Sequence, residues 1–175
     1  TDPDADRLGI AIPKNKEKSE YQLLSGNQIA TLLCDYLLET SIEQKREGIP
    51  FVAKSLVTTD LVKKITEANG GESKDVLTGF KYIAEQIKNL ESSKDKYFLF
   101  GCEESYGFLS VPSVRDKDAV SSSVLAVEMM CYLASKGLTL QDRLDAIYDK
   151  YGYSTEIVFA RDYEGASGKA EMDRI

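Results

Sequence analysis

Apolar runs of strand length alternate along this chain with longer segments whose apolar residues recur at helical spacing. The strand-like runs lie at 8–12, 51–58, 75–77, 97–100 and 153–160. Helical periodicity fills the segments at 25–37, 61–68, 80–90, 119–136 and 139–152. Strands that alternate with helices pack as a sheet covered by helices, so the pattern predicts a layered α/β fold.

Polar side chains that cap helices mark several of the expected helix starts. Ser25 and Gln28 form the Ser-x-x-Gln pattern of a capping box. Asp118 and Thr139 precede the helical segments at 119–136 and 139–152, and Thr78 could cap the helix at 80–90. Near the N-terminus, the run at 8–12 and residues 21–24 flank a polar turn, which predicts a hairpin.

Charge and composition exclude several classes of function. The net charge is −7, and a nucleic-acid backbone would need a clustered basic face. No apolar run approaches the roughly 20 residues of a membrane span, and we expect no signal peptide. The three cysteines are widely spaced, which suits a reducing compartment, so we expect a cytoplasmic protein. Since the chain has no histidine, acid–base chemistry must use carboxylates, lysine, tyrosine or arginine-assisted groups.

Three aspartates at alternate positions, Asp2, Asp4 and Asp6, are followed directly by Arg7. Carboxylates spaced in this way can converge on one hard cation, and the arginine can bind a phosphate beside it. A calcium EF-hand would need glycine at Arg7 and glutamate at Pro13. A solvated acidic turn is the other interpretation, but the arginine and the apolar run that follow favour a metal-binding loop.

The strand-like run at 97–100 leads straight into GCEESYG, residues 101–107. Ligands of α/β sheets gather at the carboxyl ends of strands, where a rigid base holds the loops. A carboxylate and a hydroxyl group there, on Glu103 and Ser105, can bind neighbouring hydroxyls of a sugar. A turn with exposed acids and no ligand explains this segment equally well when it is taken alone.

Two further segments carry weaker signals because each lies at a helix start. In RDKDA, residues 115–119, Lys117 could meet a phosphate or assist proton transfer beside a helix N-terminus, which favours anions. Thr78 and Gly79 could offer a backbone contact to a substrate. Ordinary helix capping accounts for both segments, so neither identifies a site alone.

Taken in order, DPDADR, SGNQIATLL, TGFK, GCEESYG and RDKDA resemble the α-D-phosphohexomutases, the family of phosphoglucomutase and phosphomannomutase. The chain is most similar to the branch of bacterial phosphoglucomutases and phosphopentomutases. The resemblance covers nearly the whole chain, and the ordered combination is specific although each element is modest. It implies a three-layer α/β/α domain with a mixed sheet, the third of four domains in such enzymes.

The resemblance also implies how the chain divides. Residues 1–13 would end the second domain and carry the metal loop, 14–161 would form the sugar-binding third domain, and 162–175 would link to a fourth. The parent enzyme would transfer a phosphoryl group from a phosphoserine to a hexose phosphate, form a bisphosphate, and recover a phosphoryl group. This chain lacks the phosphoserine loop and a final phosphate-binding domain, so alone it would not turn over substrate.

Site residues follow from the same resemblance. Asp2, Asp4 and Asp6 would hold Mg²⁺, which the phosphoserine helps to bind, with Arg7 beside the reacting phosphoryl group. Lys117 would be the active-site lysine. The residues that bind glucose or mannose phosphates, or the sugar bisphosphate, would be Thr78, Gly79, Glu103 and Ser105.

The sequence departs from the family in the 101–107 segment. Cys102 stands where glycine usually precedes Glu-Glu-Ser, and Tyr106 and Gly107 stand where many relatives have histidine. Both changes leave hexose and pentose substrates open, so phosphopentomutase is an alternative. A phosphatase of the DxD type is less favoured because DADR lacks the usual threonine. The rival of another class is a non-catalytic α/β binding domain that kept only the fold.

Overall fold

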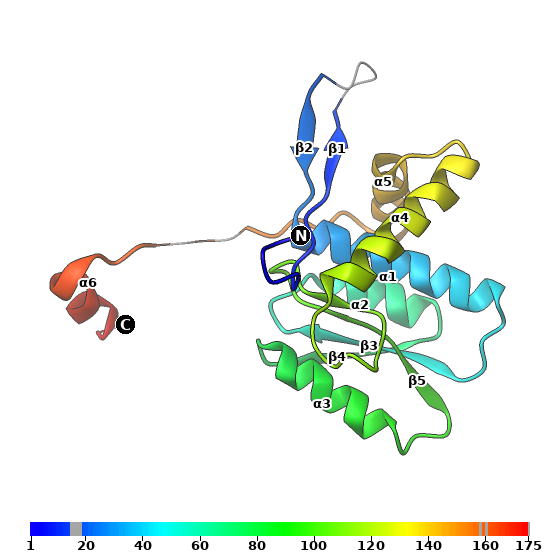
Figure 1. Ribbon diagram of the computed structural model, residues 1–175, viewed down its shortest axis with the longest axis horizontal. Helices are drawn as coiled ribbons and strands as arrows, with labels where there is room; N and C mark the ends of the chain where they lie inside the picture. Colours follow the sequence, from blue (N-terminus) through cyan, green and yellow to red (C-terminus); the bar gives the residue numbers. More distant parts are fainter. Residues whose placement is uncertain (15–18, 158, 160, 175) are drawn as a thin grey trace.

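A computed structural model describes residues 1–14, 19–157, 159 and 161–174 (Figure 1). Its central sheet has the strand order β4-β3-β5-β6. β3 (Ile49–Ser55) pairs in parallel with β4 (Glu72–Val76) and with β5 (Lys96–Cys102), and β6 (Phe108–Leu109) pairs antiparallel to β5. The predicted α/β fold with a mixed sheet is therefore confirmed.

Helices cover both faces of this sheet. α1 (Gly26–Glu43) and α2 (Asp60–Ala68) lie on one face, and α3 (Phe80–Leu90) lies on the other (Figure 1). α4 (Ala119–Ser135) and α5 (Leu140–Tyr151) pack against α1 and add to the first side. The three layers predicted from the resemblance are thus present.

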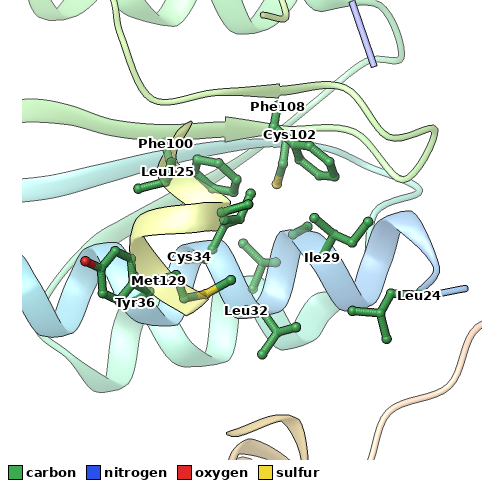
Figure 2. Close-up of a cluster of buried hydrophobic side chains, with 14 of the residues drawn as sticks. Leu24, Ile29, Leu32, Cys34, Tyr36, Phe100, Cys102, Phe108, Leu125 and Met129 are labelled. Carbon is green, nitrogen blue, oxygen red and sulfur yellow. The ribbon is translucent and has the colours of Figure 1, made fainter. Parts of the chain in front are cut away.

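The larger hydrophobic core lies between the sheet and α1. Apolar residues of α1 face the sheet because they recur at helical spacing, and Ile29 and Cys34 are fully buried there (Figure 2). Phe100 of β5 stacks on Phe108 of β6, with ring centroids 6.2 Å apart. A smaller cluster under α3 includes Ile83, so the sheet is buried on both faces.

Three of the predicted helix starts are confirmed. Ser25 and Gln28 form a capping box at α1, Thr139 forms another at α5, and Asp118 caps α4 through the amides of its first turn. The prediction for Thr78 is wrong. α3 begins at Phe80, and its N-cap residue is Gly79, which has no side chain to form a capping hydrogen bond.

Of the two predictions made for the terminal segments, one is confirmed and the other is wrong. The hairpin is confirmed as β1 (Ala11–Pro13) paired antiparallel with β2 (Tyr21–Leu23), although most of its polar turn lies outside the described residues. The predicted strand at 153–160 is wrong for residues 153–157 and 159, which form no strand, and its other two residues lie outside the described part. Near the C-terminus, α6 (Gly165–Met172) has no buried residue.

Within the described ranges, no single helix is long and apolar enough to cross a membrane. α4 and α5 satisfy the length and composition of a span only when taken together across a bend of 86°.

Candidate active site at the carboxyl edge of the sheet

The carboxyl ends of the three parallel strands open into turns at one edge of the sheet. β3 leads to the turn at 56–59, β4 to Leu77–Gly79 and β5 to the loop at 103–107. Parallel strands bring their carboxyl ends to the same edge, which is the usual ligand-binding edge of an α/β sheet. The structure therefore brings the predicted segments around Thr78 and Glu103 together.

The N-terminal loop at 2–7 is joined to this edge by backbone hydrogen bonds. Leu8 N donates to the Tyr106 carbonyl at 3.1 Å, and Arg7 bridges to Gly107. The Ala119 amide, at the start of α4, donates to the Ala5 carbonyl at 2.9 Å. Segments that lie far apart in the sequence, such as those of Ala5 and Ala119, thus meet at one place.

Lys117 lies between the N-terminal loop and the loop after β5. Its Nζ is 2.6 Å from Asp6 Oδ2. The hydrogen bond to Asp6 raises the pKa of Lys117, with further support from the charges of Asp116 and Glu103. A Cβ atom on Gly107 would lie 3.0 Å from Lys117 Cδ and 3.3 Å from Glu103 Oε2, so the lysine and the glutamate flank this glycine.

Glu103 is buried and binds the start of α3. Its Oε1 accepts a hydrogen bond from the Gly79 amide at 2.9 Å. An acidic group stabilises a helix N-terminus, so Glu103 supports the start of α3 from a distant loop by holding the amide of its N-cap residue. Thr78 and Ser105 are exposed on the same two loops.

Asp2 organises the N-terminal loop from within. Its Oδ1 accepts hydrogen bonds from the amides of Asp6 and Arg7, each at 2.9 Å, and its Oδ2 is 2.7 Å from Arg7 Nε. The Arg7 hydrogen bonds hold the pKa of Asp2 well below its usual range. The carboxylate therefore stays ionised across the physiological range.

The predicted metal ligands fit Mg²⁺ by their chemistry. Among the described residues, no three acidic or cysteine side chains are grouped so as to hold a metal ion. Asp2 is paired with Arg7, Asp6 is paired with Lys117, and Asp4 is exposed. The donor set of carboxylate oxygens is nevertheless the set that Mg²⁺ prefers, so the magnesium site stays a prediction.

Sequence reasoning missed a polar group beneath these turns. Lys54 of β3 is fully buried, and its Nζ donates to the Thr58 carbonyl at 2.9 Å and pairs with Asp75 at 2.9 Å. Asp60 completes the set at 3.3 Å. The sequence signal for this group was a lysine inside an otherwise apolar strand, because a charge that is buried needs a partner.

A groove of about 390 Å³ opens beside the N-terminal loop. Asp2, Arg7 and Tyr106 contribute to its lining, together with apolar residues of the β1–β2 region such as Leu24. The Arg7 side chain is about half exposed here, so it is accessible to an anion that enters from solvent.

Residues 25–151 match the model of phosphoglucomutase/phosphomannomutase, alpha/beta/alpha domain III. The chain belongs to this family. A phosphoglucomutase of Staphylococcus aureus is 39% identical over 175 residues, which cover 100% of this chain and 30% of that protein. The chain thus spans about a third of the length of the curated relatives it matches.

Solved structures of the same superfamily share the fold. Parafusin (phosphoglucomutase) from Paramecium, in its open form, matches 86% of this chain and 24% of its own, with a TM-score of 0.63 and 22% identity. An N-acetylphosphoglucosamine mutase variant of Aspergillus fumigatus, in complex with glucose 1,6-bisphosphate, matches 82% of this chain and 31% of its own. Its TM-score is 0.52 and its identity 20%.

Proposed function

We propose that this chain is the sugar-binding part of a longer, magnesium-dependent phosphosugar mutase that interconverts hexose 1-phosphate and hexose 6-phosphate. One observation carries the proposal. The loops at 2–7, 78–79, 103–107 and 115–118 meet at the carboxyl edge of the sheet, and they hold every residue that the family resemblance assigns. The 39% identity to a phosphoglucomutase along the whole chain supports the same activity.

In this proposal, the 103–107 loop recognises the sugar. Glu103 and Ser105 bind hydroxyl groups, and Thr78 and Gly79 contribute from the neighbouring turn. Hydroxyl recognition that does not depend on the phosphate position lets the bisphosphate bind in either orientation. The complex of an Aspergillus relative with glucose 1,6-bisphosphate supports this substrate class.

Two cations act on the transferring phosphoryl group. Arg7 stabilises its charge, and Lys117 binds phosphate or assists proton transfer at the attacking hydroxyl. Fixed positive groups stabilise the charge of a phosphoryl transition state without reorganisation during the reaction. The phosphoserine that gives and recovers the group lies in another domain of the mutase.

Asp2, Asp4 and Asp6 would hold Mg²⁺. When bound, the ion supplies Lewis-acid stabilisation of phosphoryl oxygens. Arg7 and Lys117 neutralise two of these carboxylates in the structure. Two cations beside three carboxylates leave one net negative charge, which suits a site that must hold a cation and also accept an anionic substrate.

The remaining parts of the proposal concern the whole enzyme. Residues 1–13 belong to domain 2, 14–161 to domain 3 and 162–175 to a linker toward domain 4. Domains 1, 2 and 4 contact this chain and complete the site, so the chain alone has no mutase turnover.

We propose that the enzyme is cytoplasmic, where hexose phosphates are available. Phosphopentomutase remains the alternative activity, since Cys102 and Tyr106 depart from the usual loop.

A coupled assay from glucose 1-phosphate to glucose 6-phosphate tests the proposal. It uses the complete mutase that contains this chain, Mg²⁺ and catalytic glucose 1,6-bisphosphate. We expect Glu103→Ala and Asp4→Ala to lower activity by at least about a hundredfold, as the loss of one preorganised group does elsewhere. Glu85→Ala, on the exposed side of α3, should leave activity unchanged.

The outcomes separate the candidates. Activity on ribose 1-phosphate but not on hexose phosphates would replace the hexose assignment by the pentose one. A lack of activity on both sugar phosphates, with sugar-phosphate binding retained, would favour the non-catalytic binding domain and contradict the proposed mutase.

A further inference from the structure

Glu104 lies between the two loop residues proposed to bind the sugar, yet its side chain is engaged elsewhere. Its Oε2 accepts hydrogen bonds from Ser55 Oγ at 2.9 Å and from Thr58 Oγ1 at 3.4 Å. The two hydroxyl oxygens are themselves 2.7 Å apart. Ser55 ends β3 and Thr58 lies in the turn that follows. Glu104 therefore joins the loop after β5 to the turn after β3.

The turn that receives Glu104 is fixed by a buried cation. Lys54 has no exposed surface, and its Nζ donates to the Thr58 carbonyl at 2.9 Å. The same group lies 2.9 Å from a carboxylate oxygen of Asp75 on β4. A buried ammonium group keeps such partners because leaving it unpaired is costly. The carboxylate of Glu104 thus binds hydroxyl groups that are already held in place.

The 103–107 loop needs an outside anchor. Tyr106 has a φ of 72°, a conformation uncommon for residues with a side chain. Strained loops persist only when the surroundings determine them. The carbonyl oxygen of Glu104 also lies against α1, since a Cβ on Gly26 would be 1.9 Å from it. Side chain and backbone of Glu104 are therefore both fixed by the underlying layer.

We infer that Glu104 is a positioning residue, whose carboxylate anchors the 103–107 loop to the 55–58 turn and holds Glu103 and Ser105 for the substrate. Hydroxyl donors bind a carboxylate more strongly than a neutral acceptor. Glutamine at this position keeps an acceptor oxygen at the same reach, whereas alanine removes it. The consequence for catalysis rests on the proposed function, but the anchor itself does not.

Residue-level hydrogen exchange of this 175-residue chain tests the anchor without a measurement of catalytic activity. The reporter is the Gly79 amide, which is bonded to Glu103 Oε1. We expect Glu104→Ala to speed its exchange about tenfold or more, because removing a partner of a charged hydrogen bond opens the loop by that order. Glu104→Gln should change it about threefold or less. Glu85→Ala, exposed on α3, should not change it.

Ser55, which donates a hydrogen bond to Glu104, provides an independent variant. Ser55→Ala should speed Gly79 exchange in the same way, and combining it with Glu104→Ala should add little, because both variants remove the hydrogen bond between Ser55 and Glu104. Unchanged Gly79 exchange in Glu104→Ala would overturn the inference. Equal acceleration of the core amides of α1 would also overturn it, since the carboxylate would then stabilise the whole fold.

In the mutase, positioning predicts a particular kinetic pattern. Glu104→Ala should raise the KM for the sugar phosphate about tenfold, whereas Glu104→Gln should keep the KM close to that of the wild type. A purely structural loss would lower the active fraction and apparent kcat while leaving KM unchanged, which would contradict the role. An inactive wild type would refute the proposed function, and the exchange experiment would still decide the anchor.

Discussion

The core between the sheet and α1 differs from the carboxyl edge of the sheet in how it is held. The core is held by buried apolar side chains of the helices and strands, such as Ile29 and Phe100. Polar contacts between segments far apart in sequence hold the edge, among them Asp6 with Lys117 and Gly79 with Glu103. The core therefore sets stability, whereas the edge sets the relative positions of the groups proposed to bind substrate.

The largest difference between the two regions should appear in the free energy of unfolding. Phe100→Ala removes a fully buried ring that stacks on Phe108, and we expect it to cost about 3–5 kcal/mol. Urea denaturation of the chain measures this cost. Ser105→Ala at the exposed edge should change it by about 0.5 kcal/mol or less. Similar costs for both variants would remove the distinction.

Gly26 lies where the two regions touch, and its substitution should be felt in both. A Cβ there would be 1.9 Å from the Glu104 carbonyl oxygen, so backbone must shift. We expect Gly26→Ala to cost about 1–3 kcal/mol and to change the amide resonances of residues 103–107. Gly9→Ala is the matched control, because a Cβ at Gly9 meets nothing within 4 Å. An equally mild effect at both glycines would show that α1 does not support the loop.

The smallest effect should come from the cap of α4, and it should depend on pH. Hydrogen bonds from Ser121 and Val120 lower the pKa of Asp118. A depressed carboxyl pKa adds stability above the unfolded value of about 3.9, and this is lost as pH falls through the folded pKa. Asp118→Ala should cost about 1 kcal/mol at pH 7, and the difference should shrink as the pH falls below the unfolded pKa of about 3.9. A constant difference from pH 7 to pH 2 would contradict a carboxylate cap.

Local signals in the sequence predicted the core well. The capping box at Ser25 forms as predicted, and the helix start predicted at Thr139 carries a second capping box; each box involves residues only three apart. The spacing of apolar residues likewise predicted the buried face of α1, since helical geometry alone places those residues on one side. Periodicity over consecutive residues therefore sufficed for α1 to α5 and for β3 and β5, whereas the run predicted at 75–77 shares only its first two residues with β4.

Signals that depend on distant partners were predicted less well. The cap expected from Thr78 does not form, and the carboxylate of Glu103 instead accepts from the amide of the N-cap residue Gly79, a contact that no local pattern reveals. The strand expected at 153–160 is absent from its described residues, where Ile157 is 85% exposed, because a strand needs a neighbour. β6 was missed since it has only two residues. Lys54 was overlooked within an apolar run, although its charge demanded partners.

The central claim is that the loops at the carboxyl edge form one sugar-phosphate site, and an NMR titration of the chain with glucose 1,6-bisphosphate tests it most directly. We predict that amide shifts will concentrate at Gly79, residues 103–107 and Lys117, and that Glu103→Ala will weaken binding at least about tenfold. Glu85→Ala should bind as wild type does. Shifts located elsewhere, or binding unaffected by the loss of Glu103, would contradict the account.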